Sequence, residues 1–298
     1  MSAIGAQQAA AGGRDRPARR PRGTPAHEAL AGAITAITAA GCETPRLDAE
    51  VLLAHVLGVG RERLIGDREL TVEGAAVRAY QDAVRRRAVE REPVAYITGR
   101  RGFRRLELAV DRRALIPRPE TELLVEVGLE LPRGARVLDL ATGSGAVALA
   151  LADERPDLQV SASDISEAAL ALARDNGERL GIDVNWIHAD LLAGIGDEHD
   201  AILANPPYIA DGERASLAPE IIRHEPAGAL FAGPDGLATI RRLLAQLEGR
   251  SRVSLLAIEV GAGQASRVVD LARAAGFSNV RSKRDLAGIE RTVIAERT

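Results

Sequence analysis

The sequence predicts an α/β fold in which a small all-helical domain precedes a doubly wound, mostly parallel sheet. Three observations lead to this prediction. The 298 residues suffice for about two domains. Apolar residues recur at helical spacing early in the chain, and short β-favouring segments alternate with helical ones later. Such alternation is typical of parallel sheets, whose ligands bind at the carboxyl ends of the strands.

The composition excludes several classes of function. The formal net charge is −3, so bulk positive charge does not favour binding to nucleic acid, and we expect no direct nucleic-acid partner. A single cysteine excludes an intrachain disulfide, and the five histidines have no metal-binding spacing, so we expect no metal. No stretch of about 18 apolar residues predicts a membrane span. We expect a cytoplasmic monomer that does not bind membranes.

The first part of the chain divides into a tail and a helical domain. Residues 1–25 mix Ala, Gly, Pro and Arg without periodicity, which predicts a disordered tail. Its arginines could touch RNA, but a solvated basic tail is the simpler interpretation. Residues 26–92 have apolar residues every three or four positions and predict a helical domain. Within it, Pro45 is expected to begin a helix that Gly58 ends.

A short connection and the larger domain follow. Residues 93–115 alternate β-favouring and polar side chains around two glycines, which predicts a β-hairpin joining the two domains. Residues 116–298 then form the α/β domain. Its candidate strands, which are separated by helical segments, are 136–140, 159–164, 185–188, 201–204, 254–260, 279–282 and 292–295.

A glycine-containing loop follows the first candidate strand of the sheet. Gly143 and Gly145 permit a tight turn and allow a ligand to approach the backbone. Taken alone, such a turn is also typical of a plain strand-to-helix connection. The residues of the candidate cofactor loop are Ala141, Thr142, Gly143, Ser144 and Gly145.

Aspartates end the next two candidate strands. Asp164 lies about twenty residues beyond the loop, where a carboxylate can accept hydrogen bonds from ribose hydroxyls. Asp190 ends the third strand and is placed to accept from the exocyclic amine of adenine. Each aspartate could instead cap a helix. Because glycine or acidic features stand at three consecutive strand ends, we favour a nucleotide-containing cofactor.

The fourth candidate strand ends in Asn205, Pro206, Pro207 and Tyr208. Proline has no N–H, so the strand cannot continue and the carbonyls are held in fixed directions. The side chain of Asn205 and the carbonyl of Pro206 could bind a planar NH₂ group, while the ring of Tyr208 stacks on it. The alternative is a proline-rich turn with a surface tyrosine. Its position beside the cofactor loop favours a catalytic site.

These motifs resemble those of the class I S-adenosylmethionine-dependent methyltransferases, and within them the HemK/PrmC family. That resemblance implies a Rossmann-like methyltransferase domain and S-adenosyl-L-methionine as the cofactor. It also implies methylation of N5 of the glutamine in the Gly-Gly-Gln motif of class-1 peptide chain release factors. The segments that carry the resemblance are 45–50, 92–99, 115–122, 205–208, 225–226 with 233–237, and 285–288.

The resemblance also implies roles for individual residues. Asn205 would lie close to the cofactor and, with Pro206, Pro207 and Tyr208, would hold the glutamine side chain. Residues 116–122 would either lie along the site or only form a joint between domains. The residues implied to bind the cofactor are Ala141, Thr142, Gly143, Ser144, Gly145 and Asp164 for its amino-acid and ribose parts, and Asp190 and Leu191 for adenine.

Three positions depart from the family pattern. Ala141 stands where glycine is common, which is tolerated if its φ is negative. Arg104 and Arg105 follow Phe103 where the family often has another aromatic residue. Leu191 stands where an aromatic is frequent, so aliphatic surface would pack against adenine. These departures bear on cofactor affinity more than on the type of reaction.

Three other functions remain open at this point. A sister enzyme type methylates a glutamine of a large-subunit ribosomal protein, but it generally has Ser-Pro-Ile-Ala-Glu where this chain has Pro119-Glu120-Thr121-Glu122. A nucleic-acid adenine or guanine N-methyltransferase grips a flipped base with the same tetrapeptide. A binding module without catalysis is disfavoured by the intact motifs. The helical domain is expected to contact the release factor.

Overall fold

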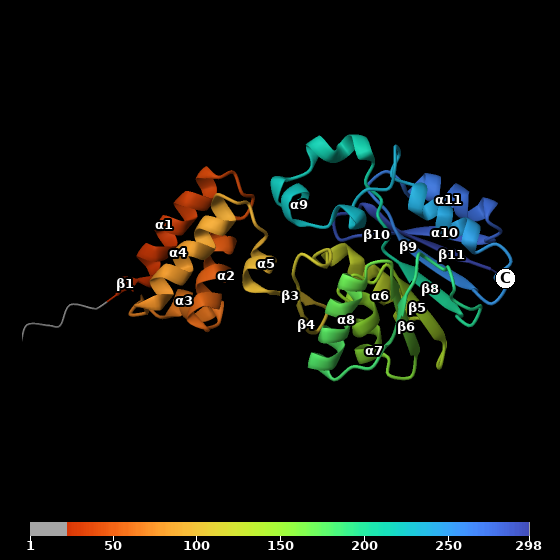
Figure 1. Cartoon of the computed structure of the whole chain (residues 1–298), viewed down its shortest axis with the longest axis horizontal. Coiled ribbons are helices and arrows are strands. Elements are labelled where there is room, and N and C mark those ends of the chain that lie inside the picture. Colours follow the sequence, from red (N-terminus) through yellow and green to blue (C-terminus); the bar gives the residue numbers. More distant parts are fainter. Residues whose placement is uncertain (1–22, 298) are drawn as a thin grey trace, which may run out of the picture. The chain divides into compact units, whose positions relative to one another are not determined.

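The computed structural model describes residues 23–297 and divides into two compact units (Figure 1). The smaller unit comprises residues 23–38 and 43–84 of this range, and the larger one comprises residues 39–42 and 85–297. The division therefore falls inside a helix and not at residue 92, where the sequence suggests a boundary. The last turn of that helix, from Arg85, belongs to the larger unit, in which Arg87 bonds Glu220.

The smaller unit is a bundle of helices: α1 (Ala26–Ala39), α2 (Pro45–Leu57), α3 (Arg61–Gly66) and the greater part of α4 (Ala75–Ala88). As predicted, Pro45 begins α2, and Gly58 ends it in the left-handed conformation with φ of 64°. The hydroxyl of Tyr80 donates to the carbonyl of Ala49 over 3.1 Å inside the bundle.

The tail predicted for residues 1–25 is wrong at its end. Strand β1 (Thr24–Pro25) pairs antiparallel with β2 (Thr71–Val72), so these residues are held by backbone hydrogen bonds. The remainder of that prediction, residues 1–22, lies outside the described residues.

The predicted hairpin at residues 93–115 is confirmed only in its middle. Strands β3 (Arg100–Phe103) and β4 (Leu106–Ala109) pair antiparallel, but the preceding residues form helix α5 (Val94–Thr98). Tertiary packing explains the difference, because Tyr96 is buried and its hydroxyl donates to the carbonyl of Ala114 over 2.7 Å. A helix places this ring inward where an alternating strand would expose neighbouring apolar residues.

The larger unit contains a seven-stranded sheet in the order β10-β11-β9-β8-β5-β6-β7. All of its strands coincide with predicted segments to within a few residues. The neighbours from β9 through β7 are parallel, and β11 runs antiparallel to both β9 and β10. The strands are β5 (Arg136–Leu140), β6 (Gln159–Asp164), β7 (Asn185–His188), β8 (Ala201–Ala204), β9 (Leu255–Glu259), β10 (Asn279–Arg284) and β11 (Glu290–Glu296).

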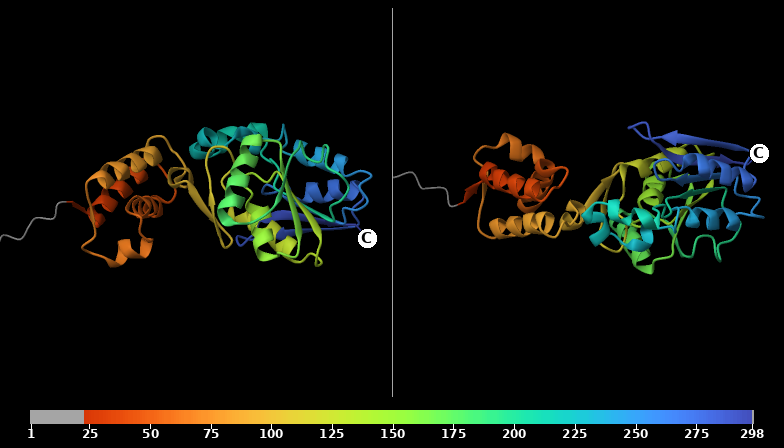
Figure 2. Two further views of the ribbon diagram at one scale, coloured as in Figure 1. Left: turned by 60° about the horizontal axis from the view of Figure 1, so that its bottom comes forward. Right: turned by 90° about the horizontal axis from the view of Figure 1, so that it is seen from above.

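Helices cover both faces of this sheet, as Figures 1 and 2 show. One face packs against α6 (Glu122–Leu129), α7 (Ala146–Glu154) and α8 (Glu167–Leu180), and the other against α10 (Ala238–Gln246) and α11 (Ala265–Ala274). Alternate strand residues enter the two cores: Val137 lies in one, and Leu138 lies in the other. Because β5 has β6 on one side and β8 on the other, a crevice forms at their carboxyl ends.

Short helices surround that end of the sheet. They are the 3₁₀ turns η1 (Pro119–Thr121), η2 (Asp211–Ser216) and η3 (Ala227–Ala229), and helix α9 (Pro219–His224).

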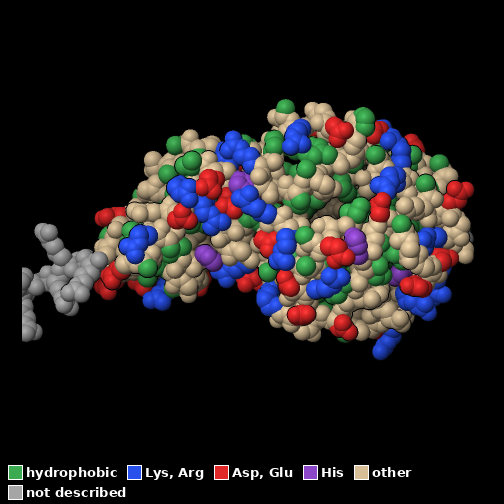
Figure 3. All heavy atoms as spheres, in the orientation of Figure 1, with side chains coloured by type: hydrophobic (Ala, Val, Ile, Leu, Met, Phe, Trp, Pro, Cys, Tyr) green, Lys and Arg blue, Asp and Glu red, His purple; other side chains and the backbone are tan. Residues whose placement is uncertain are grey.

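Residues 23–297 contain neither a candidate membrane-spanning helix nor a candidate metal-binding cluster. No helix there is long and apolar enough to cross a membrane, and no group of three or more His, Cys, Asp or Glu side chains could hold a metal ion. On the face drawn in Figure 3, blue Lys and Arg side chains are interspersed with red Asp and Glu side chains.

Candidate active site

A cavity of about 350 Å³ opens at the carboxyl ends of β5, β6, β7 and β8. It collects most of the residues that the sequence assigned to a site, although three of them, Gly145, Pro206 and Tyr208, are not in its lining. Its volume lies in the range of small-molecule pockets. The assigned residues that line it are Ala141, Thr142, Gly143, Ser144, Asp164, Asp190, Leu191, Asn205 and Pro207.

The loop after β5 makes its turn through left-handed backbone. The φ angles are 60° at Ala141, 57° at Gly143 and 85° at Gly145. The condition under which alanine would be tolerated at position 141, a negative φ, is therefore not met, and this alanine is strained where a glycine would not be. Gly145 acts in packing, since a Cβ there would lie 3.1 Å from both Trp186 and Leu149.

Asp139, a buried acid that the sequence did not single out, fixes this loop to β5. Asp139 on β5 is 2% exposed, and its Oδ2 accepts hydrogen bonds from the hydroxyl of Thr142 (2.5 Å) and the N–H of Ala148 (3.1 Å). Burial raises the pKa of Asp139 to about 7. The only signal in the sequence is an acid inside an otherwise apolar strand.

Asp164, at the end of β6, joins the glycine loop to the next helix. Its Oδ2 accepts from the N–H of Gly143 over 2.9 Å, and its Oδ1 accepts from the N–H of Ser166 over 2.9 Å. Burial raises the pKa of this carboxyl. Asp164 is not the N-cap of α8. That role belongs to Ser166, whose hydroxyl accepts from the N–H of Ala169. The two oxygens of a carboxylate offer about four lone-pair sites, so Asp164 keeps the capacity to accept from a ligand.

The loop after β8 is fixed by side chains. The Nδ2 of Asn205 donates to the hydroxyl oxygen of Thr121 over 3.1 Å. Tyr208 donates its hydroxyl to Oε1 of Glu259 over 3.3 Å, and its carbonyl accepts from Nε2 of Gln264 over 2.8 Å. The two prolines between Asn205 and Tyr208 stiffen the backbone. Asn205 and Pro207 thus face the cavity on a rigid support.

Glu259 is a second buried acid that sequence reasoning missed. It ends β9 and is 1% exposed, and burial raises its pKa to about 7 even though hydrogen bonds from Thr121 and Tyr208 act in the opposite direction. Its Oε2 has no hydrogen-bond partner within the described part of the chain. An acid closing an apolar strand is again the only trace of it in the sequence.

Comparisons with known proteins identify the family. The family model "PrmC N-terminal domain" matches residues 28–99, and the "Methyltransferase small domain" model matches residues 119–233. A release factor glutamine methyltransferase of Rhodospirillum rubrum is 42% identical over 265 residues, which cover 87% of this chain and 81% of that protein. The chain belongs to the release factor glutamine methyltransferase family.

Other relatives of this methyltransferase agree. A release factor glutamine methyltransferase of Bordetella pertussis is 44% identical over 253 residues, which cover 83% of this chain and 93% of that protein. The solved hMettl16 catalytic domain, in complex with MAT2A 3'UTR hairpin 6, covers 75% of this chain and 81% of its own at 17% identity, with a TM-score of 0.53. That likeness shows the class I methyltransferase fold. The family and the fold class inferred from the sequence are both confirmed.

At the end of the methyltransferase cavity that lies beyond β7, Asp190 is held by an arginine. The Arg242 guanidinium lies 2.6 Å from the Oδ2 of Asp190, and both residues line the cavity. Leu191 has φ of 55° and packs its side chain into the core, so the lining there is aliphatic, as expected. Arg242 was missed because nothing in the sequence distinguishes it among many arginines.

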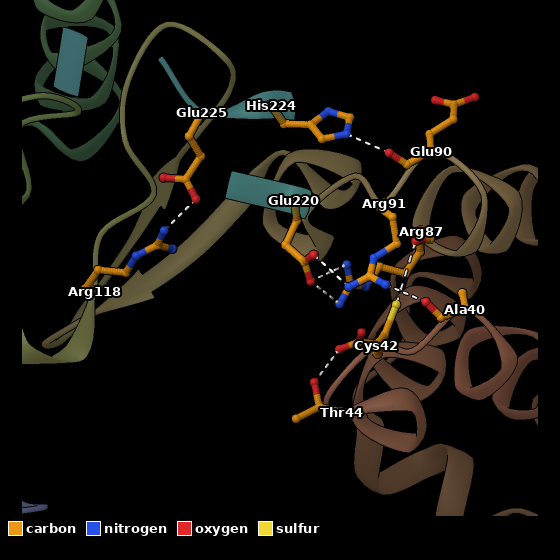
Figure 4. A network of polar contacts seen from close by, with 11 residues as sticks. Ala40, Cys42, Thr44, Arg87, Glu90, Arg91, Arg118, Glu220, His224 and Glu225 are labelled. Carbon is orange, nitrogen blue, oxygen red and sulfur yellow. Dashed lines mark hydrogen bonds and ion pairs between the residues drawn. The ribbon is translucent and has the colours of Figure 1, made fainter. Parts of the chain in front are cut away.

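One wall of the methyltransferase cavity belongs to the segment between β8 and α10. Pro226, Gly228 and Ala229 line it, and the segment is anchored by ion pairs (Figure 4). Glu225 pairs with Arg118 over 2.5 Å. The other anchors are Glu220 with Arg87 (3.2 Å) and Arg91 (2.8 Å), and the His224 ring with the carbonyl of Glu90 (2.8 Å).

The segment at residues 116–122 lies along this cavity and is more than a joint, since Pro117, Arg118 and Thr121 all line it.

Arg104, which departs from the family pattern, lies away from the cavity lining. Its guanidinium bonds both carboxylate oxygens of Glu154, at 2.9 and 2.8 Å, and Arg104 does not line the cavity. Arg104 therefore joins the turn between β3 and β4 to the end of α7.

Proposed function

We propose that this chain transfers the methyl group of S-adenosyl-L-methionine to N5 of the glutamine in the Gly-Gly-Gln motif of class-1 peptide chain release factors. One observation carries the proposal: a single cavity brings Asn205 together with the loop after β5 and with Asp164. The family supplies the class of substrate, since its curated members are named release factor glutamine methyltransferases. The helical domain at residues 26–92 is proposed to contact the release factor.

The residues of the cavity fit S-adenosyl-L-methionine. Gly143 lets the cofactor approach the backbone, because only open space lies where its Cβ would point, apart from Ala114 at 3.9 Å. Asp164 would accept from the ribose hydroxyls with its remaining lone pairs. Asp190 and the aliphatic surface at Leu191 would hold adenine. When bound, the cofactor supplies an electrophilic methyl group on a sulfonium.

Orientation is the main contribution that this chain makes to the reaction. A carboxamide nitrogen is a poor nucleophile because its lone pair is delocalised into the carbonyl. We propose that the Oδ1 of Asn205 and the carbonyl of Pro206 accept the two amide hydrogens and aim the nitrogen at the methyl group. Holding a near-attack geometry contributes about 7–11 kcal/mol in favourable cases. Tyr208 is proposed to restrict the plane of the amide with its ring.

Methyl incorporation into a purified release factor tests the role of Asn205. Asn205→Ala is expected to lower kcat by a factor on the order of a thousand, because the amide loses its acceptor and its alignment. Tyr208→Phe keeps the ring and is expected to cost about tenfold or less, since only the bond to Glu259 is lost.

Asn185→Ala is the matched control, since Asn185 lies on β7 and bonds only the exposed Ser161 hydroxyl among the described contacts. Its kcat should equal that of the wild type. A near-normal kcat for Asn205→Ala would contradict the proposed role of Asn205 in orienting the glutamine amide.

The choice of substrate is tested separately. Labelled S-adenosyl-L-methionine is incubated with the enzyme and with purified release factor, ribosomes or DNA in parallel. Incorporation into the release factor, at the glutamine of Gly-Gly-Gln, is expected. Stronger incorporation into a ribosomal protein or into DNA would replace this substrate with one of the other candidates.

A further inference from the structure

Behind Asn205 lies a chain of hydrogen-bonding groups that the reaction as described above does not use. The Nδ2 of Asn205 donates to the hydroxyl of Thr121 over 3.1 Å, and the side chain of Thr121 lies close enough to the carboxyl of Glu259 to lower its pKa. Thr121 is 5% exposed and Glu259 is 1% exposed, so no bulk water competes for these bonds. The chain ends at Oε2 of Glu259, which has no hydrogen-bond partner within residues 23–297.

We propose that Glu259 and Thr121 are positioning residues that fix the side-chain amide of Asn205 with its oxygen toward the substrate. This inference rests on the role proposed above for Asn205, whose oxygen must face the glutamine amide to accept from it. An asparagine amide can be turned by 180° at little steric cost, and its direction is decided by its hydrogen-bond partners. In this site the deciding partner is Thr121.

The hydroxyl hydrogen of Thr121 sets the direction of the Asn205 amide. A threonine hydroxyl has one hydrogen to donate. When that hydrogen goes to the carboxylate of Glu259, Thr121 can only accept from Asn205, which must then turn its NH₂ group inward. The Oδ1 of Asn205 is thereby left on the cavity side. Tyr208 donates to the same carboxyl, at Oε1, so Glu259 acts on the substrate loop directly at Tyr208 and through Thr121 at Asn205.

The ionisation state of Glu259 controls this arrangement. A neutral carboxyl is a weaker acceptor, so the hydrogen of Thr121 can turn to Asn205 and allow the amide to present NH₂ to the cavity. Burial places the pKa of Glu259 at about 7. The charged groups that act on it are Glu120 on η1, which raises the pKa, and Arg291 on β11, which lowers it. The competent form is the ionised one, and it is lost as the pH falls.

The test measures kcat for methylation of a purified release factor between pH 6 and pH 8.5. For the wild type, kcat should rise about tenfold from pH 6 to pH 8 and then level off, as expected for one group with a pKa near 7. Glu259→Gln and Thr121→Val should lower kcat at pH 8 by about ten- to a hundredfold and abolish this rise. The KM for S-adenosyl-L-methionine should change little, because neither side chain is proposed to bind it.

Two variants distinguish positioning from a merely structural role. Thr121→Ser keeps the hydroxyl and should retain both the rate and the pH profile. Thr292→Val removes another buried hydroxyl beside Glu259, since Thr292 lies opposite it on β11, and should leave kcat and its profile unchanged. Thermal unfolding of each variant checks that it is folded.

The outcomes separate this inference from the proposed function. A rise in kcat with pH that persists in Glu259→Gln overturns the inference, and so does a Thr292→Val variant as slow as Thr121→Val. If Glu259→Gln does not fold, comparison of Thr121→Val with Thr121→Ser decides alone: equal rates overturn the inference. An inactive wild type would instead overturn the proposed substrate, whereas inactive Asn205→Ala beside a normal Glu259→Gln overturns only the positioning role.

Discussion

The loops that follow β5 and β8 border the same cavity, but they are held in shape by different means. The loop at residues 141–145 is shaped mainly by its backbone, with positive φ at three positions and the N–H of Gly143 donating to Asp164. The hydroxyl of Thr142 adds one side-chain bond, to Asp139. The loop at residues 205–208 has no positive φ. Its shape comes from two prolines and from side-chain bonds to Thr121, Glu259 and Gln264.

This difference corresponds to what each loop is proposed to hold. A cofactor that lies across the loop needs close approach to the backbone, so small residues and tight turns serve it. A substrate amide needs one acceptor aimed in one direction, which a side chain on a rigid support provides. Substitutions that add atoms should therefore lower the stability of the protein when they crowd the first loop, and should lower kcat when they displace the second.

Among substitutions of the small residues in and beside the two loops, the largest effect is expected where a glycine touches the substrate loop. Gly236 has φ of 72°, and a Cβ there would lie 2.2 Å from the carbonyl oxygen of Tyr208. Gly236→Ala must displace Tyr208, and a shift of about 1 Å in a positioned group can cost on the order of a hundredfold in rate. We expect that loss in kcat, with binding of S-adenosyl-L-methionine retained, as calorimetry would show.

Gly212→Ala is the control for Gly236→Ala. Gly212 lies in the same connecting segment and has no positive φ, and the Cβ of an alanine there would meet only open space. Equal activity of the two variants would contradict the proposed sensitivity of the substrate loop.

A smaller effect, on stability, is expected in the cofactor loop. Gly145→Ala combines the cost of positive φ with crowding against Trp186 and Leu149, so it should lower the free energy of unfolding by about 2–3 kcal/mol. Gly143→Ala has the same backbone problem but open space, and should cost about 1 kcal/mol. Denaturant unfolding measures both, and equal costs would show that packing at Gly145 is unimportant.

The smallest effect is a gain. Ala141→Gly relieves a left-handed alanine, worth about 1–2 kcal/mol, and adds about 0.5–1 kcal/mol of chain entropy cost. We expect a net stabilisation of about 0.5–1 kcal/mol, seen as a higher unfolding temperature. Leu191→Gly relieves a similar φ but removes a core side chain, so it should destabilise. A loss of stability in Ala141→Gly would mean that the loop is not strained.

The sequence was sufficient to predict the sheet because its strands are β-favouring runs and, with the exception of β11, each ends at or within about three residues of a Gly, Asp or Pro. It was insufficient at Ala141, since alanine gives no sign of a left-handed backbone, and at residues 94–98, where packing of Tyr96 overrides local alternation. Asp139 and Glu259 could not be recognised, because an acid inside an apolar strand has meaning only when its partners are known. The ion pair of Arg118 with Glu225 could not be predicted either, because it joins residues that are far apart in the chain.

Strand β11 has a consequence for the substrate loop. It lies between β9 and β10, and its residue Thr292 stands opposite Glu259. The burial of the acid that is proposed to orient Asn205 therefore depends on β11, which follows β9, α11 and β10 in the chain. Because β9 gains this neighbour only when β11 inserts into the sheet, the environment of Glu259 depends on a segment that is distant from the substrate loop in the chain.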